Sequence, residues 1–178
     1  KMFSNKTFRT AKEVYLNTGY EPLNELISGD YHKGIQVGKM MEIYGPSSSG
    51  KTLIATMLMI AAQKAGGAAF FADYERSFSP EFAKKLGLDL ESPKFIHYFP
   101  DTWEDGNTAA MRFCDALRSS SEFPDDAPIV VVQDSIAAAI PKSVFEKGID
   151  EYNMNDNTAL SRVTSTTLKA VKQFVEKY

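Results

Sequence analysis

The stretch Met40-Met41-Glu42-Ile43-Tyr44-Gly45-Pro46-Ser47-Ser48-Ser49-Gly50-Lys51-Thr52 decides the fold. A run of strand-forming residues leads into a loop of glycine, proline and serine, and Lys51 and Thr52 then open a helical pattern. The spacing G-x-x-x-x-G-K-[ST] in this strand, loop, helix context is typical of a phosphate-binding loop. We therefore expect a strand over residues 40–44 and a helix over residues 52–64, joined by that loop.

The residue types of the loop suit an anionic ligand. Glycine at two positions permits turns in which successive backbone N–H groups point inward, and the start of the helix adds partial positive charge. The lysine would supply charge to the outer phosphates, and the threonine hydroxyl would hold Mg²⁺. The expected nucleotide contacts are Gly45, Pro46, Ser47, Ser48, Ser49, Gly50, Lys51 and Thr52. The alternative, a glycine-serine turn with a solvated lysine, is disfavoured by the flanking patterns.

The composition is that of an ordinary globular domain. The chain has 178 residues, of which 43% are hydrophobic and 24% charged, so it fits one domain with a real core. The formal net charge of −3 gives no global attraction to nucleic acid, so binding of that kind would need a local basic surface. Cys114 is the only cysteine, which excludes an internal disulfide and a cysteine-based metal site. We expect its thiol to be buried rather than reactive.

The sequence carries no sign of a membrane or secretory segment. No uninterrupted apolar run reaches the length of a bilayer crossing, and the first residues lack the apolar core of a signal peptide. We therefore expect an intracellular, cytoplasmic location and no membrane partner. His32 and His97 belong to no motif and are expected to be solvated or satisfied by neighbours.

Strands and helices alternate along the rest of the chain. The strand patterns cover residues 68–72, 95–99 and 129–132, and the helical patterns cover 22–27, 80–86, 104–119 and 160–178, with a loop region over 137–154. Unalternated apolar strands between helices predict an α/β fold with a mainly parallel sheet and helices on both faces. Residues 18–178 are expected to form this core, and residues 1–17 a basic arm, which could equally pack on another subunit or be a frayed terminus.

Acidic residues follow two of the predicted strands. Asp134 comes just after the apolar strand 129–132, at the sheet edge where ligands of parallel sheets sit, and is a candidate for holding Mg²⁺ through water. Asp73 and Glu75 follow the strand 68–72, and a carboxylate there could orient and deprotonate the water that attacks a γ-phosphate. We favour Glu75 for this role, although the residues alone separate it only weakly from Asp73.

Taken in order, these motifs resemble the RecA-type recombinases. The resemblance runs from about residue 18 to residue 178 and rests on Met41 to Thr52, on Phe71-Ala72-Asp73-Tyr74-Glu75, on Ser79-Pro80-Glu81-Phe82-Ala83-Lys84-Lys85-Leu86-Gly87-Leu88-Asp89, on Pro100-Asp101-Thr102 and on Asp134-Ser135-Ile136-Ala137-Ala138-Ala139-Ile140-Pro141-Lys142. It implies ATP and Mg²⁺ as cofactors, with Glu75 and Lys51 as catalytic residues and Thr52 and Asp134 at the metal. It also implies that Ser79 and Phe82 contact adenine, with the Phe82 ring stacking on the base.

The resemblance further implies filaments on single-stranded DNA for homologous recombination and repair. Residues 145–154 correspond to the first DNA-binding loop of the family, with Met154 as a base contact and Lys142, Lys147 or Arg162 as phosphate contacts. Two departures stand out. Gln133 puts a polar side chain where the family usually has an apolar one. The family core also continues with further strands, a glutamine that senses the γ-phosphate and a second DNA-binding loop, which have no counterpart here.

Two other classes compete with a DNA-dependent ATPase. A RecA-fold motor or nucleotide kinase shares the loop, but a kinase needs a lid with arginines, and the arginines here are scattered. The third possibility is a truncated nucleotide-binding module that self-associates without turnover. ATP hydrolysis stimulated by single-stranded DNA would separate the recombinase from the kinase, and binding without turnover would identify the module.

Overall fold

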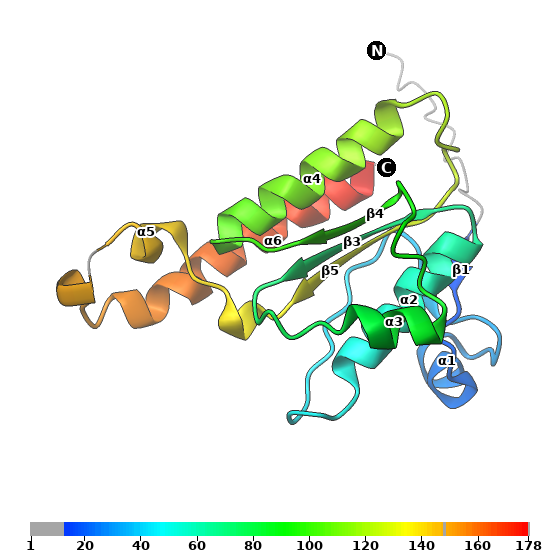
Figure 1. Ribbon diagram of the computed structural model, residues 1–178, viewed down its shortest axis with the longest axis horizontal. Coiled ribbons are helices and arrows are strands. Elements are labelled where there is room, and N and C mark those ends of the chain that lie inside the picture. Colours follow the sequence, from blue (N-terminus) through cyan, green and yellow to red (C-terminus); the bar gives the residue numbers. More distant parts are fainter. Residues whose placement is uncertain (1–12, 148, 178) are drawn as a thin grey trace, which may run out of the picture.

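The computed structural model describes residues 13–147 and 149–177. Along the chain its strands are β1 (Tyr15–Leu16), β2 (Ile35–Gln36), β3 (Ala68–Asp73), β4 (Phe95–Tyr98) and β5 (Ile129–Asp134). The α-helices are α1 (Glu21–Ser28), α2 (Lys51–Lys64), α3 (Pro80–Leu86), α4 (Trp103–Ser119), α5 (Lys142–Phe145) and α6 (Ala159–Lys177) (Figure 1). Short 3₁₀ turns occupy Ile136–Ala138, Ile149–Glu151 and Asp156–Thr158.

A parallel sheet forms the centre of the fold. Its strand order is β4-β3-β5, and both pairings are parallel. All residues of β3 are buried, as the unalternated apolar pattern Ala68 to Ala72 predicts for a strand covered on both faces. The α/β prediction is confirmed, and the strands predicted over residues 68–72, 95–99 and 129–132 and the long helices form within a residue or two of their expected bounds.

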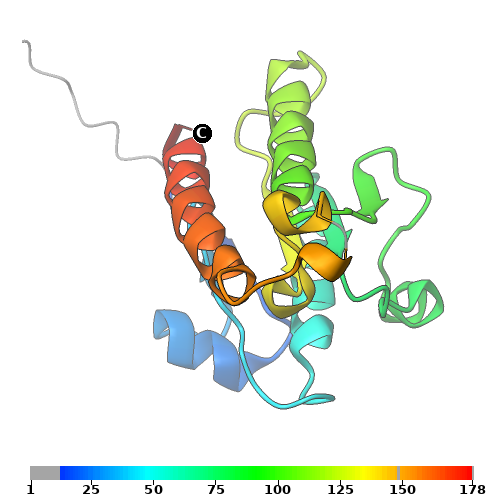
Figure 2. The same ribbon diagram turned by 90° about the vertical axis from the view of Figure 1, so that its left-hand side faces the viewer.

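Helices cover both faces of the sheet because neighbouring residues of β3 point to opposite sides. Ala69 and Phe71 pack with Met59 and Ile60 of α2 and with Ala83 of α3. The alternate residues of β3, Phe70 and Ala72, pack instead with Ala110 of α4. In Figure 1, α2 and α3 lie below the sheet and α4 lies above it, while α6 runs beside α4, as Figure 2 also shows.

The predicted strand over residues 40–44 is wrong. These residues form no strand, and Met40, Met41 and Tyr44 have exposed fractions of 45%, 42% and 89%. A strand is stable only when a neighbour satisfies its backbone N–H and C=O groups. In the described part of the chain no backbone hydrogen bond joins residues 40–44 to another strand, and β5 is an edge strand whose Val131 remains 39% exposed.

Other differences lie at the beginning of the chain. The short strands β1 and β2 form an antiparallel pair that the sequence patterns did not predict, and β1 lies within the predicted arm. Residues 1–12 of that arm lie outside the described residues. Over residues 13–147 and 149–177, none of the helices combines the length and the apolar character that a bilayer crossing requires.

Candidate functional site

The carboxyl ends of β3 and β5 meet at one edge of the sheet. Their last residues, Asp73 and Asp134, are partners in the parallel register. The backbone N–H of Tyr74 donates to the carbonyl oxygen of Asp134 at 2.8 Å and extends the contact past the strand ends. The structure thus brings together the two acidic segments that follow these strands, at the edge where ligands of open parallel sheets bind.

The glycine-rich loop reaches the same edge through Thr52. Its hydroxyl Oγ1 donates to Oδ2 of Asp134 at 2.7 Å, and the bond is partly buried. A hydroxyl and a carboxylate oxygen in contact are the kind of oxygen donors that Mg²⁺ takes from a protein. No group of three or more histidine, cysteine or acidic side chains in the described residues is arranged to hold a metal alone. The pair therefore fits a metal that completes its coordination with phosphate oxygens and water.

The first turn of α2 leaves donors for an anion. Gly50 precedes the helix with φ 91°, a left-handed conformation that favours glycine, and no side chain caps the helix start. The first helical bond runs from Ile54 N–H to the Gly50 carbonyl at 3.0 Å. The N–H groups of residues 51–53 therefore have no acceptor in the described part of the chain. They adjoin a hollow of about 230 Å³ lined by residues 48–53, which fits a phosphate group.

The Lys51 ammonium group is hydrogen-bonded within the glycine-rich loop. Its Nζ donates to the carbonyl oxygens of Gly45 at 3.0 Å and Pro46 at 2.9 Å, so the side chain folds back over its own loop. These acceptors are neutral, whereas a phosphate oxygen carries charge and forms a stronger bond with an ammonium group. The lysine is accordingly near the anion-binding donors and able to exchange the carbonyl groups for phosphate.

Glu75 and Asp73 have different surroundings. The Glu75 side chain is exposed, and its Oε1 accepts a hydrogen bond from the hydroxyl of Ser135, the residue after Asp134. Asp73 is only 2% exposed and accepts the backbone N–H groups of Ser77 and Phe78 at 3.2 and 3.3 Å. The Glu75 carboxylate is therefore accessible beside the Thr52–Asp134 pair. The Asp73 carboxylate is buried and stabilises the turn that leads to Ser77 and Phe78.

The predicted adenine contacts lie at the start of α3. The Ser79 side chain caps this helix by accepting the Phe82 N–H at 3.3 Å, and the Phe82 side chain is 51% exposed. The exposed ring offers an aromatic face, and the Ser79 hydroxyl keeps its own O–H as a donor while its oxygen caps the helix. No hydrogen bond or ring contact joins either residue to residues 45–52 in the described part of the chain, so their role at adenine stays a prediction.

Gln133 has a partner that the sequence did not reveal. The hydroxyl of Tyr74 donates to Gln133 Oε1 at 2.8 Å, joining β5 to the segment after β3. Burial raises the pKa of Tyr74 above its ordinary value, and the nearby carboxylates of Asp105 and Glu104 add to the effect. The tyrosine therefore remains a neutral donor, and the polar residue at 133 is satisfied within the fold.

The cations of the predicted DNA-binding loop are already engaged. Lys142 pairs with Glu146 at 3.6 Å, and Lys147 pairs with Asp156 at 2.5 Å. The hydrogen bond from Lys147 is the main cause that holds the pKa of Asp156 below its usual value. Arg162 donates to the Asn155 carbonyl at 3.2 Å, while Met154 is 87% exposed. The loop thus presents an apolar tip but no surplus of positive charge.

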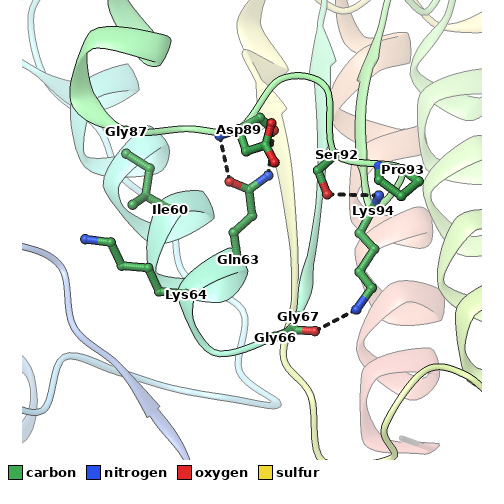
Figure 3. Close-up of a pocket in the computed structure, with 10 residues that line it drawn as sticks. All are labelled: Ile60, Gln63, Lys64, Gly66, Gly67, Gly87, Asp89, Ser92, Pro93 and Lys94. Atoms are coloured by element: carbon green, nitrogen blue, oxygen red, sulfur yellow. Dashed lines mark hydrogen bonds between the residues drawn. The ribbon is translucent and has the colours of Figure 1, made fainter.

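A larger hollow, of about 390 Å³, lies at the opposite edge of the sheet (Figure 3). Gln63 and Asp89 form two reciprocal hydrogen bonds, from Gln63 Nε2 to the Asp89 carbonyl at 2.8 Å and from Asp89 N–H to Gln63 Oε1 at 2.9 Å. Lys94 Nζ donates to the Gly66 carbonyl at 3.1 Å. The hollow lies at the amino ends of β3 and β4, away from the glycine-rich loop. These hydrogen bonds connect the segments that line it.

Most of the chain matches a known protein family. The model of the RecA N-terminal domain matches residues 17–178, a range that contains every residue of the site described above.

Proposed function

This chain belongs to the RecA family, and we propose that it is the nucleotide-binding core of a DNA recombinase, which binds ATP with Mg²⁺ and hydrolyses ATP on single-stranded DNA. The observation that carries the proposal is the 2.7 Å hydrogen bond between Thr52 and Asp134. It joins the phosphate loop to the carboxyl edge of the sheet, where both cofactor-binding motifs of such an ATPase have to meet.

Each side chain of the site has a proposed task. Lys51 and the free N–H groups at the start of α2 bind the phosphates of ATP and fix their orientation. Thr52 and Asp134 would hold Mg²⁺, which would supply positive charge to offset the charge that develops on the phosphate oxygens. Glu75 accepts a proton from the water whose oxygen attacks the γ-phosphorus, and the bond to the ADP oxygen breaks. The Ser135 hydroxyl keeps that carboxylate at the strand edge.

Base recognition is assigned to the start of α3. We propose that the exposed Phe82 ring stacks on adenine, which buries apolar surface on both sides and adds a modest stacking energy. Ser79 fixes the beginning of the helix and hence the position of that ring. Among the described residues no hydrogen bond or ring contact joins Ser79 or Phe82 to residues 45–52, so in the proposal the nucleotide itself bridges the two parts.

Binding to DNA is proposed to depend on assembly. The segment from Lys142 to Asp156 contains more carboxylates than lysines, and both lysines are paired with carboxylates. A single copy therefore offers little attraction to phosphates. Repetition of a weak contact in every subunit of a filament supplies affinity through avidity.

The contacts of several arginines argue against a nucleotide kinase. Arg76 lies 5.1 Å over the Phe99 ring, and Arg118 donates to the carbonyl oxygens of Pro124, Asp125 and Ala127. Arg162 is bonded to Asn155. These side chains support local structure, whereas a kinase needs arginines on a lid that closes over the transferred phosphate.

The deciding experiment measures nucleotide binding and turnover in the same preparation. Fluorescent ATP should bind with Mg²⁺, and ATP hydrolysis should rise when single-stranded DNA is added. Stimulation by a nucleoside monophosphate instead of DNA would identify a kinase, and binding without hydrolysis under any condition would identify a nucleotide-binding module. Absence of nucleotide binding would contradict all three functions.

A further inference from the structure

The imidazole ring of His97 packs among the aromatic rings of Phe71, Phe78 and Phe99. This residue belongs to β4, where it pairs in register with Phe71 of β3, and its side chain is 18% exposed. Its ring centroid is 5.7 Å from that of Phe71, 4.9 Å from that of Phe78 and 4.3 Å from that of Phe99. These rings fix the imidazole plane, so its Nε2 points in one direction, and that nitrogen lies 3.2 Å from Oδ2 of Asp73.

Asp73 transmits this contact to the turn that carries Glu75. Its Oδ1 accepts the Ser77 N–H and its Oδ2 accepts the Phe78 N–H, while the same Oδ2 lies within hydrogen-bond distance of the His97 imidazole. Asp73 is 2% exposed, so these partners replace water that the carboxylate lost on folding. Glu75 is two residues further along the chain, inside the segment that Asp73 closes.

Aromatic contacts also hold the turn at Phe78 and at Arg76. Phe78 is buried, and its ring centroid lies 4.4 Å from that of Phe71. Arg76 has φ 53°, a left-handed conformation that costs energy for a residue with a Cβ, and its guanidinium lies over Phe99. The turn is therefore held in a conformation that a free chain would rarely adopt. The residues that hold it, Asp73, Phe78 and Phe99, all contact the ring of His97.

We propose that His97 is a positioning residue for ATP hydrolysis. Its Nε2–H donates to Asp73, which fixes the turn over residues 74–78 and keeps the Glu75 carboxylate beside Ser135 at the strand edge. The inference rests on the proposed function, because it assumes that Glu75 activates the attacking water. A displacement of about 1 Å in such a group is enough to slow a reaction on the order of a hundredfold.

The test compares two substitutions of His97. His97→Phe retains a ring for packing but has no donor, whereas His97→Gln carries an amide N–H near the position of Nε2. In His97→Phe we expect kcat for DNA-stimulated ATP hydrolysis to fall about tenfold to a hundredfold, with KM and nucleotide affinity within about twofold of wild type. His97→Gln should recover most of kcat, and His32→Phe, which replaces an exposed histidine, should match the wild type.

Amide hydrogen exchange gives a readout that does not depend on turnover. The N–H groups of Ser77 and Phe78 should exchange at least about tenfold faster in His97→Phe than in wild type or His97→Gln, because their acceptor is no longer fixed. NMR of the wild-type imidazole should show a proton on Nε2, a measurement that stands even if His97→Phe does not fold. Lack of that proton, or unchanged kcat and exchange in His97→Phe, would overturn the inference. Equal loss of kcat in both variants with unchanged exchange would also overturn it.

These results are separable from failure of the proposed function. If the wild-type protein neither binds nor hydrolyses ATP, the recombinase ATPase assignment fails, and with it the catalytic part of the inference. Exchange at Ser77 and Phe78 would still report whether His97 holds the turn. If the wild type hydrolyses ATP and the His97 variants do too at equal rates, the function stands and His97 has no positioning role.

Discussion

The hydroxyl of Thr52 donates a 2.7 Å hydrogen bond to Oδ2 of Asp134, across 82 positions of the chain. Thr52 lies in the first turn of α2 and Asp134 ends β5, so this bond joins the phosphate loop directly to the strand edge. A hydroxyl and a carboxylate oxygen in contact suit the surroundings of Mg²⁺, whose remaining ligands would come from ATP and water. The bond therefore predicts that loss of either partner changes metal-dependent binding first.

Thr52→Val tests that prediction with little change in shape. We expect the affinity for ATP to fall about tenfold when Mg²⁺ is present, because a ligand of the metal is lost, and to stay unchanged when EDTA removes the metal. Isothermal titration calorimetry with and without Mg²⁺ measures both. Thr108→Val, on the exposed surface of α4, is the matched control and should leave both affinities unchanged. An equal loss with and without metal would show that Thr52 acts through the loop conformation.

Lys51→Ala should reduce nucleotide affinity by on the order of 3 kcal/mol, which corresponds to a loss of more than a hundredfold. The reason is that the ammonium is already held over the loop by the carbonyl groups of Gly45 and Pro46 and needs little reorganisation to meet a phosphate. Fluorescence anisotropy with labelled ATP gives the affinity. Lys169→Ala on α6 removes an exposed lysine elsewhere, and equal affinities of the two variants would contradict the assignment of Lys51.

Glu75→Gln should affect hydrolysis far more than binding. The amide retains the size of the side chain but is not a base, so turnover should fall on the order of a hundredfold while the affinity for ATP is kept. Ser135→Ala should have a smaller effect of the same kind, since it removes only the donor that holds Glu75. Steady-state ATPase assays on single-stranded DNA measure both. Turnover of Glu75→Gln near that of wild type would return the role of base to Asp73 or to a neighbouring subunit.

The parts of the site that follow from motif spacing and from strand patterns could be predicted from the sequence. The loop motif predicted a helix beginning near Lys51, and the strand patterns predicted that Asp134 and Glu75 would lie at one edge of the sheet. Parallel strands bring their carboxyl ends together whatever the loops between them contain, so these residues could be related without coordinates. That Glu75 rather than Asp73 is accessible needed the structure, because both residues follow the same strand.

Other features depend on contacts that no local pattern contains. Residues 40–44 have the composition of a strand, but strand formation requires a partner, and the described residues supply none. Gln133 and His97 are isolated polar residues in the sequence, and only the side-chain contacts of the structure reveal that they meet Tyr74 and Asp73. Cys114, expected to be buried, is only partly so. Periodicity reports the face of a helix and not the depth of one position on it.

Cys114 offers a test of burial through pH. Burial raises the pKa of its thiol from the ordinary 9.0 to about 11. Near pH 8 the native protein should therefore react with iodoacetamide about a hundredfold more slowly than the urea-unfolded chain, because the thiolate is the nucleophile. Since the folded state keeps its proton at higher pH than the unfolded state, the free energy of unfolding should fall as pH rises from about 9 to 11. Equal labelling rates before and after unfolding would contradict the raised pKa.

The last prediction concerns the loop from Lys142 to Asp156. Lys142 is exposed and only loosely paired with Glu146, whereas Lys147 is bonded to Asp156, which also accepts the Asn153 N–H at 2.8 Å. We therefore expect Lys142 to be the lysine that reaches phosphate in an assembled filament. Lys142→Ala should flatten the slope of log affinity for single-stranded DNA against log salt by about 0.7, the value for one lost phosphate contact.

Lys147→Ala separates a DNA contact from a structural one. Removing Lys147 should raise the pKa of Asp156, measured by NMR titration of its carboxyl group, because the Lys147 hydrogen bond is the main cause that lowers it. Asp156 ionises below its usual pKa, so the pair's contribution to stability is present above that usual value and is lost as pH falls through the lowered one. The salt slopes of wild type, both variants and the Lys169→Ala control are then compared. Identical slopes throughout would remove these lysines from the DNA path, whereas a change in Lys142→Ala alone would identify this loop as a DNA contact within the filament.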